Sequence, residues 1–171
     1  MKNNVLFILL FTSTFIFSQH INTRFIAVDK GATEKFEKGV AKKTKTFNSK
    51  EGQLRFYTFQ VNTGSNMGNY MRVRYEDEMK GFDVNPSKEA MKLWNAEVSD
   101  IMTNMDGRMQ SLNKNASHVV VSPFSKPLRT VMEYTYKGGM SDEFWRFRNN
   151  VAKAVKESGA DIFMEVWGCA S

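Results

Sequence analysis

Few side chains in this sequence are suited to acid–base chemistry. Apart from His20, the only histidine is His118, whose imidazole could act as a general base or ligate a haem iron. Glu133 and Glu165 fall on two segments expected to be strands, and paired carboxylates can exchange protons with a substrate. No spacing motif supports either function. An ordinary strand residue is therefore the alternative for His118, and the distance between the two carboxylates does not follow from the sequence.

A second group of residues shares one face of the expected strands. Alternation in the segment 54–61 places Leu54 and Phe56 toward the helices and turns the intervening residues the other way. The segment 162–167 repeats this pattern. The same alternation in the other expected strands adds His118 and further charged residues to the face that points away from the helices. Aromatic walls with a few charges are typical of ligand sites, whereas solvation or mutual pairing of the charges is the alternative. The expected ligand-binding set is Arg55, Tyr57, Phe59, Arg72, Arg74, Glu133, Glu165 and Trp167.

Metal binding is not expected. The single cysteine, Cys169, lies in an apolar strand pattern, which favours a buried, inert thiol, and no cluster of cysteine and histidine is present. The sequence identifies no cofactor, because it contains no glycine-rich phosphate loop, nucleophile elbow or paired-histidine zinc motif.

Three helices would position these residues. Phe36, Val40 and Phe47 share one side of a helix over residues 33–48. Apolar residues at steps of three and four from Met91 to Leu112 predict a long second helix that begins at Pro86, with Asn85 as its cap. Its tryptophan and methionines are read as core packing. The third helix spans residues 141–158, with Ser141 as cap and Gly159 as its end.

Strands are expected between these helices at residues 23–28, 54–61, 70–75, 118–122, 129–136 and 161–169. The first four strands and two helices follow the order of the split β-α-β unit of ferredoxin-like folds. Both helices would cover one face of a four-stranded antiparallel sheet, so another layer must cover the opposite face.

Residues 108 positions apart suggest an internal duplication. The segment 33–36 matches 141–144 as hydroxyl, acid, charged residue and phenylalanine, and two flanking strands fall in the same gapless register. Chance similarity of two strand-helix-strand units is the alternative. The expected organisation is a signal peptide over residues 1–18, a first repeat over 19–126 and a partial second repeat over 127–171. The missing elements would come from further sequence after Ser171, which we prefer, or from a partner chain in a homo-oligomer.

Two such units packed sheet to sheet would form a barrel. From its element order and from the phrase 133–145, in which a strand leads through glycines into an acidic, aromatic helix start, the chain resembles the dimeric α+β barrel superfamily. The groups it most resembles are the antibiotic-biosynthesis monooxygenases and the NIPSNAP-like proteins. The resemblance implies an α+β fold in which a ferredoxin-like unit is duplicated to form a pseudo-dimeric barrel. The second repeat would be incomplete.

The N-terminus predicts export. A lysine at position 2, an apolar core over residues 5–17 and Ser18 describe a signal peptide, and that core is shorter than the about 20 residues a membrane helix needs. We expect a periplasmic or secreted protein without an integral membrane segment after cleavage. Export also argues against nucleic acid as a partner, although residues 30–50 contain seven lysines and only two glutamates.

Three functions are compatible with these patterns. The first is binding of a small, partly apolar ligand between the two sheets. The second, allowed by the resemblance, is a cofactor-free monooxygenase or haem-degrading enzyme that uses Trp167, His118 and Arg72. The third is an interaction module whose lysine-rich first helix meets an anionic surface.

Overall fold

The structure is a computed structural model that describes residues 19–120 and 128–169. The expected signal peptide at residues 1–18 therefore lies outside the described residues, as does the end of the strand expected at 118–122. No described helix is long and apolar enough to cross a membrane.

The sheet is antiparallel, with five strands in the order β2-β3-β1-β4-β5. The strands are β1 (His20–Val28), β2 (Phe56–Gln60), β3 (Tyr70–Glu76), β4 (Met102–Leu112) and β5 (Trp167–Cys169). The first four, with α1 (Thr33–Phe47) and α2 (Lys88–Glu97), form the expected split β-α-β unit. The α+β, ferredoxin-like class is thus confirmed.

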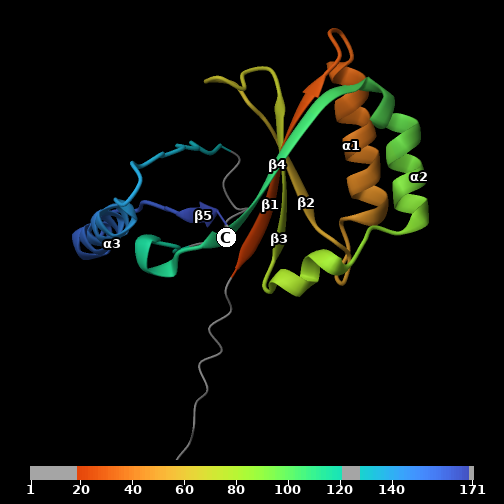
Figure 1. The fold of residues 1–171 in the computed structure, drawn as a ribbon. Coiled ribbons are helices and arrows are strands. Elements are labelled where there is room, and N and C mark those ends of the chain that lie inside the picture. The colour runs from red at the N-terminus through yellow and green to blue at the C-terminus, as the bar shows by residue number, and fades with distance from the viewer. Residues whose placement is uncertain (1–18, 121–127, 170–171) are drawn as a thin grey trace, which may run out of the picture.

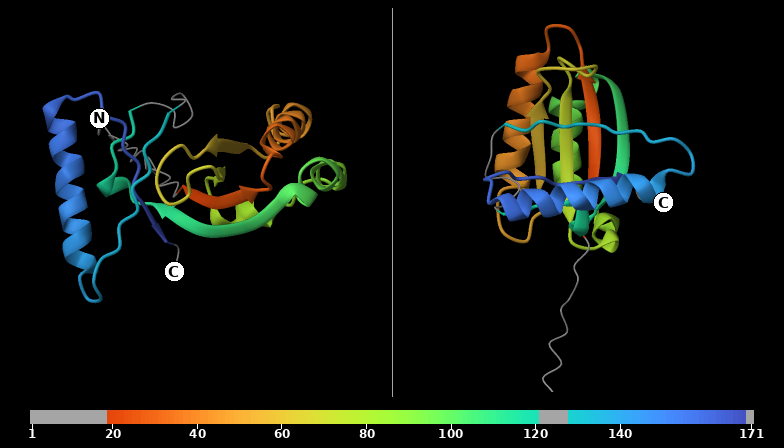
Figure 2. Two further views of the ribbon diagram at one scale, coloured as in Figure 1. Left: turned by 90° about the horizontal axis from the view of Figure 1, so that it is seen from above. Right: turned by 90° about the vertical axis from the view of Figure 1, so that its left-hand side faces the viewer.

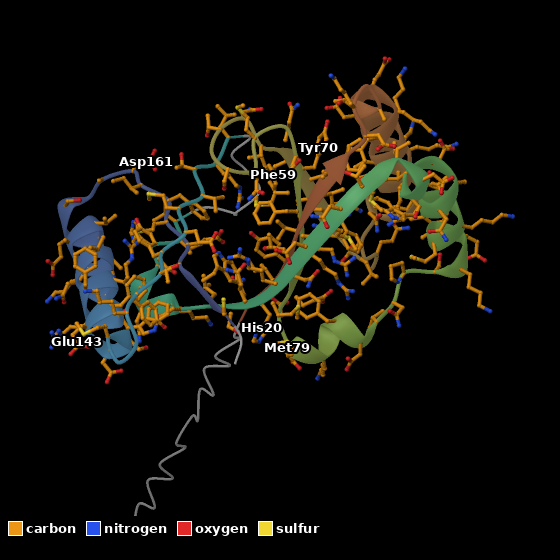
Figure 3. The ribbon with its side chains drawn as sticks, turned by 45° about the horizontal axis from the view of Figure 1, so that its top comes forward. His20, Phe59, Tyr70, Met79, Glu143 and Asp161 are labelled. Carbon is orange, nitrogen blue, oxygen red and sulfur yellow. The ribbon has the colours of Figure 1, made fainter. Side chains whose placement is uncertain are left out.

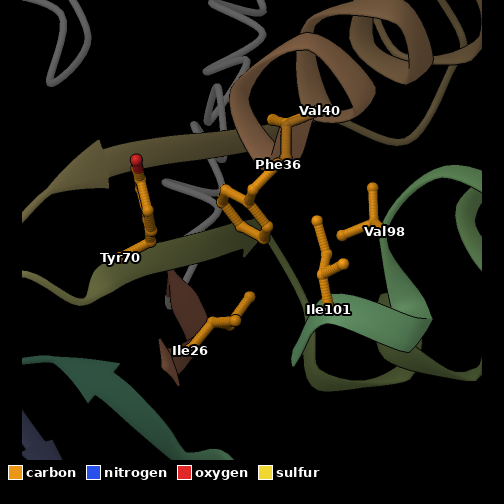
Figure 4. Close-up of a cluster of buried hydrophobic side chains, with 6 residues drawn as sticks. All are labelled: Ile26, Phe36, Val40, Tyr70, Val98 and Ile101. Carbon is orange, nitrogen blue, oxygen red and sulfur yellow. The ribbon is translucent and has the colours of Figure 1, made fainter. Parts of the chain in front are cut away.

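The helices α1 and α2 pack side by side on one face of this sheet, and α3 (Ser141–Ser158) lies on the other side (Figures 1 and 2). The core between sheet and helices contains the fully buried Phe36 and Ile26 (Figure 4). The Phe36 and Tyr70 rings lie 4.4 Å apart, which ties α1 to β3. Full burial of a side chain such as Phe36 contributes about 1.5–3 kcal/mol to stability.

Helix α2 is shorter than predicted. Ser87, not Asn85, caps it by accepting a hydrogen bond from the Ala90 N–H at 3.1 Å. The helix ends at Glu97, a 3-10 turn follows at Ser99–Ile101, and the chain then enters β4. The prediction of one long helix was wrong. The segment after Ile101 contains several weak helix formers, and its pairing with β1 along its length stabilises a strand instead. Met105, assigned to the core, is half exposed.

The C-terminal strands are also shorter than predicted. His118 makes one isolated bridge, to Met164, and only Trp167–Cys169 of the segment 161–169 joins the sheet. Within the described residues, 129–136 form no strand. Two short 3-10 turns, Met79–Asp83 and Lys114–Ala116, complete the order of elements.

Helix α3 begins and ends close to the prediction. Ser141 is its first residue rather than its cap, and Gly159 ends it in the left-handed conformation, at φ 66°. This helix matches α1 in the proposed repeat, but duplication and the domain boundaries stay predictions.

Candidate functional site

The predicted ligand residues lie on two faces of the sheet. Tyr57 and Phe59 pair with Val73 and Met71 and face the C-terminal residues, as predicted. Arg72 and Arg74 face α1 and α2 instead, because β3 presents Tyr70 to the core and every second residue follows it. Figure 3 shows Phe59 and Tyr70 on neighbouring strands, Tyr70 on the side of α1. The predicted orientation of Arg72 and Arg74 was wrong. Val73, on the opposite face of β3, is buried as well, so the polarity of the side chains does not show which face of this strand meets the helices.

The remaining predicted residues are spread over the molecule. Arg55 is exposed just before β2, and Glu133 is exposed and paired with Arg108. His118 exchanges backbone hydrogen bonds with Met164, at 2.8 and 2.9 Å, and so belongs to the C-terminal layer. Cys169, expected to be buried, is exposed. Among the described residues, no three His, Cys, Asp or Glu side chains are grouped so as to hold a metal ion.

Two buried cations share an aromatic environment beneath α1 and α2. Arg72 comes from the middle of β3, where it lies between Arg24 on β1 and Thr58 on β2. Lys43 comes from α1, on the side that also carries Phe36 and Val40. Only 5% of Arg72 and 3% of Lys43 is exposed. We call these residues, with Phe56 and Trp94, the cation cluster.

The two cations contact the same two rings. The Arg72 Cζ atom lies 4.6 Å from the centre of the Phe56 ring and 4.8 Å from that of Trp94. The Lys43 Nζ atom lies 4.9 Å and 5.6 Å from the same two centres. Cation–π contacts compensate part of the hydration that these charges have lost. They supply no counter-charge, so the cluster keeps a net positive potential.

Hydrogen bonding leaves the cluster incompletely satisfied. Arg72 Nη1 donates to Thr58 Oγ1 at 2.8 Å, and Lys43 Nζ donates to Asn48 Oδ1 at 3.2 Å. Both acceptors are neutral. Among the described residues, Arg72 Nη2 is buried and has no hydrogen-bond partner. A buried charged donor without an acceptor is costly, by about 1–3 kcal/mol or more.

The pKa values reflect this environment. Burial, and then the charge of Arg72, lowers the pKa of Lys43 from 10.5 to about 8. Burial, and then the charge of Arg24, lowers the pKa of Arg72 to about 10. In both cases the second cause is another cation. An anion placed here would relieve both the repulsion and the unmet hydrogen bond.

Arg74, two residues after Arg72 on β3, is a contrasting case. It forms an ion pair with Glu76 at 2.6 Å and donates to the carbonyl groups of Gly81 and Val84 at 2.5 and 3.0 Å. Its charge is matched and its donors are used. We therefore assign Arg74 to holding the turn Met79–Asp83 against the sheet rather than to a ligand.

A groove opens next to the cation cluster. Its volume is about 270 Å³, slightly below the usual range of ligand pockets. The groove runs between α1 and the neighbouring strands β2 and β3, and it is lined by Phe36, Glu37, Val40, Ala41, Thr58, Gln60 and Tyr70. Thr58 is both part of the groove wall and the acceptor for Arg72, so it lies between the groove and the buried guanidinium.

The opposite face of the sheet has a different character. There, Arg129 and Glu165 form an ion pair at 3.5 Å, with 17% and 7% of their side chains exposed. The Trp167 ring lies 5.7 Å from Tyr75, and Arg129 lies 5.4 Å from the Phe59 ring. Burial raises the pKa of Glu165, while Arg129 and hydrogen bonds from Trp167 and Tyr75 oppose that rise. These matched charges tie the C-terminal layer to the sheet.

One feature of the sequence does indicate the cation cluster. Lys43 occupies a position of the apolar stripe that Phe36, Val40 and Phe47 define, so a lysine there must be buried or must displace the helix. The lysines on the exposed side of α1 are partly neutralised, because Lys38 pairs with Glu34 and Lys42 pairs with Glu97, both at 2.5 Å.

Comparison with known proteins gives little beyond the fold. No family model matches the chain, and no curated protein matches it. Among solved structures, it is similar to an uncharacterised NIPSNAP-like domain protein from Burkholderia xenovorans, with 10% identity and a TM-score of 0.43. The match covers 67% of this chain and 95% of that one. It is a weak, fold-level resemblance, consistent with the one expected from the sequence.

Proposed function

We propose that this protein is an exported binding protein for a small organic anion, held by the cation cluster. The acidic group of the ligand would take the place between Arg72 and Lys43, and its apolar part would contact Phe56 and Trp94. The proposal keeps the partly apolar ligand expected from the sequence but moves it from between the sheets to the helix-covered face.

The observation that carries this proposal is the unused Arg72 Nη2 beside a second buried cation. Structural cations in protein interiors normally have a carboxylate partner, as Arg74 and Arg129 do here. A carboxylate is the group best matched to a planar guanidinium, because it can accept two parallel hydrogen bonds. The two aromatic rings favour a ligand with an apolar or aromatic part.

Titration with phenylacetate tests the proposal, followed through the indole N–H resonance of Trp94 in an NMR spectrum. Phenethyl alcohol, which has the ring but no charge, should bind far more weakly. Replacing Arg72 by Met should weaken phenylacetate binding by about 10- to 100-fold, since a charge-assisted hydrogen bond contributes about 1.5–3 kcal/mol. Arg146→Met is the matched control, because Arg146 is exposed on α3. Equal binding of the acid and the alcohol would contradict the proposal.

Two alternatives from the sequence stay hypotheses. A monooxygenase or haem-degrading enzyme would need His118 near the reacting group. The backbone of His118 is hydrogen-bonded to Met164, in the segment after α3. A haem titration without a Soret change would count against the haem-degrading version, and an unchanged activity in His118→Ala would remove the role of His118. For an interaction module, the pairing of Lys38 and Lys42 leaves fewer free charges on α1. Absence of binding to anionic vesicles at low salt would remove that one.

Export is tested separately. Expression of the full chain in a Gram-negative host, with fractionation and N-terminal sequencing, should give a periplasmic or secreted protein that begins near Gln19. A cytoplasmic protein that retains Met1 would contradict the export part of the proposal and leave the binding part intact.

A further inference from the structure

The Lys43 side chain ends in the protein interior beside a single hydrogen-bond acceptor. Its Nζ atom donates to Asn48 Oδ1 at 3.2 Å, and among residues 19–120 and 128–169 no carboxylate forms an ion pair with it. An ammonium group has three N–H donors to satisfy, whereas a neutral amine can donate to Asn48 and keep a free lone pair. The surroundings of Lys43 therefore suit a neutral amine better than an ammonium ion.

Asn48 holds this amine in place. The Asn48 Nδ2 group donates to the Leu54 carbonyl at 2.6 Å, which turns Oδ1 toward Lys43, and only 7% of Asn48 is exposed. On its other side, the Lys43 Nζ atom lies over the Phe56 and Trp94 rings. The amine thus has a fixed position in apolar surroundings, as a lysine that attacks a carbonyl group requires.

The neighbouring guanidinium increases the nucleophilic character of this amine. Burial, and then the charge of Arg72, bring the pKa of Lys43 to about 8. At about pH 7.5, the neutral fraction of such an amine is roughly 200-fold larger than that of a lysine with the ordinary pKa of 10.5. A lysine desolvated beside a second cation is one of the arrangements in which proteins form Schiff bases with carbonyl substrates.

We propose that Lys43 forms a reversible imine with a 2-oxo acid whose carboxylate is held by Arg72. This inference rests on the proposed function and narrows its ligand to acids that carry a carbonyl group next to the carboxylate. Lys43 and Arg72 lie over the same two rings, so the carboxylate and the reacting carbon must be close together in the ligand.

The reaction needs no reagent other than the oxo acid and a proton from solvent. The Nζ lone pair forms a bond to the carbonyl carbon, and the carbonyl oxygen takes up the two amine protons and leaves as water. With the proton from solvent, the product is a protonated imine. Its positive charge stays beside the carboxylate, so the attraction between the former amine and the acid is retained.

Reductive trapping tests the inference. The protein is incubated at about pH 7.5 with 2-oxo-4-phenylbutanoate and sodium cyanoborohydride, whose hydride converts an imine into a stable secondary amine. We expect one adduct on Lys43 by mass spectrometry of the intact protein and of its peptides. Lys45, exposed on the same helix, is the internal control and should stay unmodified. Peptide mapping also separates Lys43 from the α-amino group of the chain, whose usual pKa is about 7.7–8.0.

Two relatives of this probe need no variant, so they stay informative if a substituted chain does not fold. The ketone 4-phenyl-2-butanone lacks the carboxylate and should label Lys43 far more slowly. The acid 4-phenylbutanoate lacks the carbonyl group and should protect Lys43 from labelling. Arg72→Met should slow labelling by the oxo acid by about 10- to 100-fold, with Arg146→Met as the matched control.

The outcomes separate this inference from the proposed function. Phenylacetate binding without an adduct on Lys43 would overturn the imine and leave the anion site standing. Absence of both would overturn both. Labelling spread over the exposed lysines, or equal labelling of Lys43 by the ketone and the oxo acid, would also overturn the assignment.

Discussion

At the scale of single residues, the least expected feature is a lysine in the core. Lys43 lies where an apolar stripe would place a leucine, and its amine and the Arg72 guanidinium contact the same rings. The sequence correctly separated Phe56 from Tyr57 and Phe59, because their strand alternates in a regular way. It did not separate Arg72 from Val73, because both faces of β3 are buried and side-chain polarity alone could not orient it.

The pKa of Lys43 predicts how stability depends on pH. With a pKa of about 8 in the folded protein and 10.5 when unfolded, Lys43 is neutral in the fold but still protonated in the unfolded chain between these values. The unfolded state then binds more protons than the folded state. The contribution of Lys43 to the free energy of unfolding therefore rises with pH from about 8 to 10.5. Lys43→Met should remove that rise, measured by urea unfolding from pH 7 to 10.5.

Lys45→Met is the control, because Lys45 is exposed on the same helix. The two variants should differ most below pH 8, where Lys43 in the folded wild-type protein carries its proton at a cost. Parallel stability curves for both variants would mean that Lys43 is not held in the environment described.

The same ionisation governs ligand binding. A bound carboxylate should raise the pKa of Lys43, so binding should take up a fraction of a proton near pH 8 and weaken as pH rises above that value. Calorimetric titration of phenylacetate in buffers of different ionisation enthalpy measures the uptake. Affinity that is independent of pH from 7 to 9 would place the ligand away from Lys43.

At the scale of elements, the contact between α1 and α2 depends on a glycine. A Cβ atom on Gly39 would lie 2.7 Å from Val98 Cγ2 and 3.1 Å from Glu97 Cβ, so the helices approach through this position. Gly39→Ala should destabilise the protein by about 1–3 kcal/mol despite the better helix propensity of alanine. Gly138→Ala, where no atom lies within 4 Å, is the control in the same unfolding experiment.

A neutral or stabilising Gly39→Ala would show that the helices can separate at little cost.

The elements themselves were predicted with unequal success. Helices α1 and α3 followed from their stripes, whereas the segment after Ile101 matched a helical period only by chance. Its methionines fit steps of three and four, but the pairing with β1 that determines its structure is a contact between residues far apart in sequence.

At the scale of the whole molecule, charged and aromatic side chains join the C-terminal layer to the sheet. The Arg129–Glu165 pair and the Tyr75–Trp167 contact hold the C-terminal layer on the sheet. Arg129→Met would leave the buried Glu165 carboxylate without its counter-charge, at a cost of about 3–5 kcal/mol. We expect faster hydrogen exchange in α3 and β5, with little change in α1.

Restoring neutrality should reverse part of this effect. The double variant Arg129→Met, Glu165→Gln should regain much of the protection in α3, because no unpaired charge then lies beneath the layer. Uniform acceleration of exchange in α1 and α3 would show that the two layers unfold as one unit. The layered α+β architecture followed from the order of elements. The short β5 and the irregular course of residues 129–136 did not, since strand formation depends on contacts with distant parts of the chain.

Arg72 and Lys43 are proposed to bind an organic acid on the helix-covered face. A crystal structure with phenylacetate tests it most directly. We expect the carboxylate within hydrogen-bond distance of Arg72 Nη2 and Lys43 Nζ, with the phenyl ring against Phe56 or Trp94. A cluster that stays closed around its own side chains, with the acid bound beside Trp167 or nowhere, would contradict it.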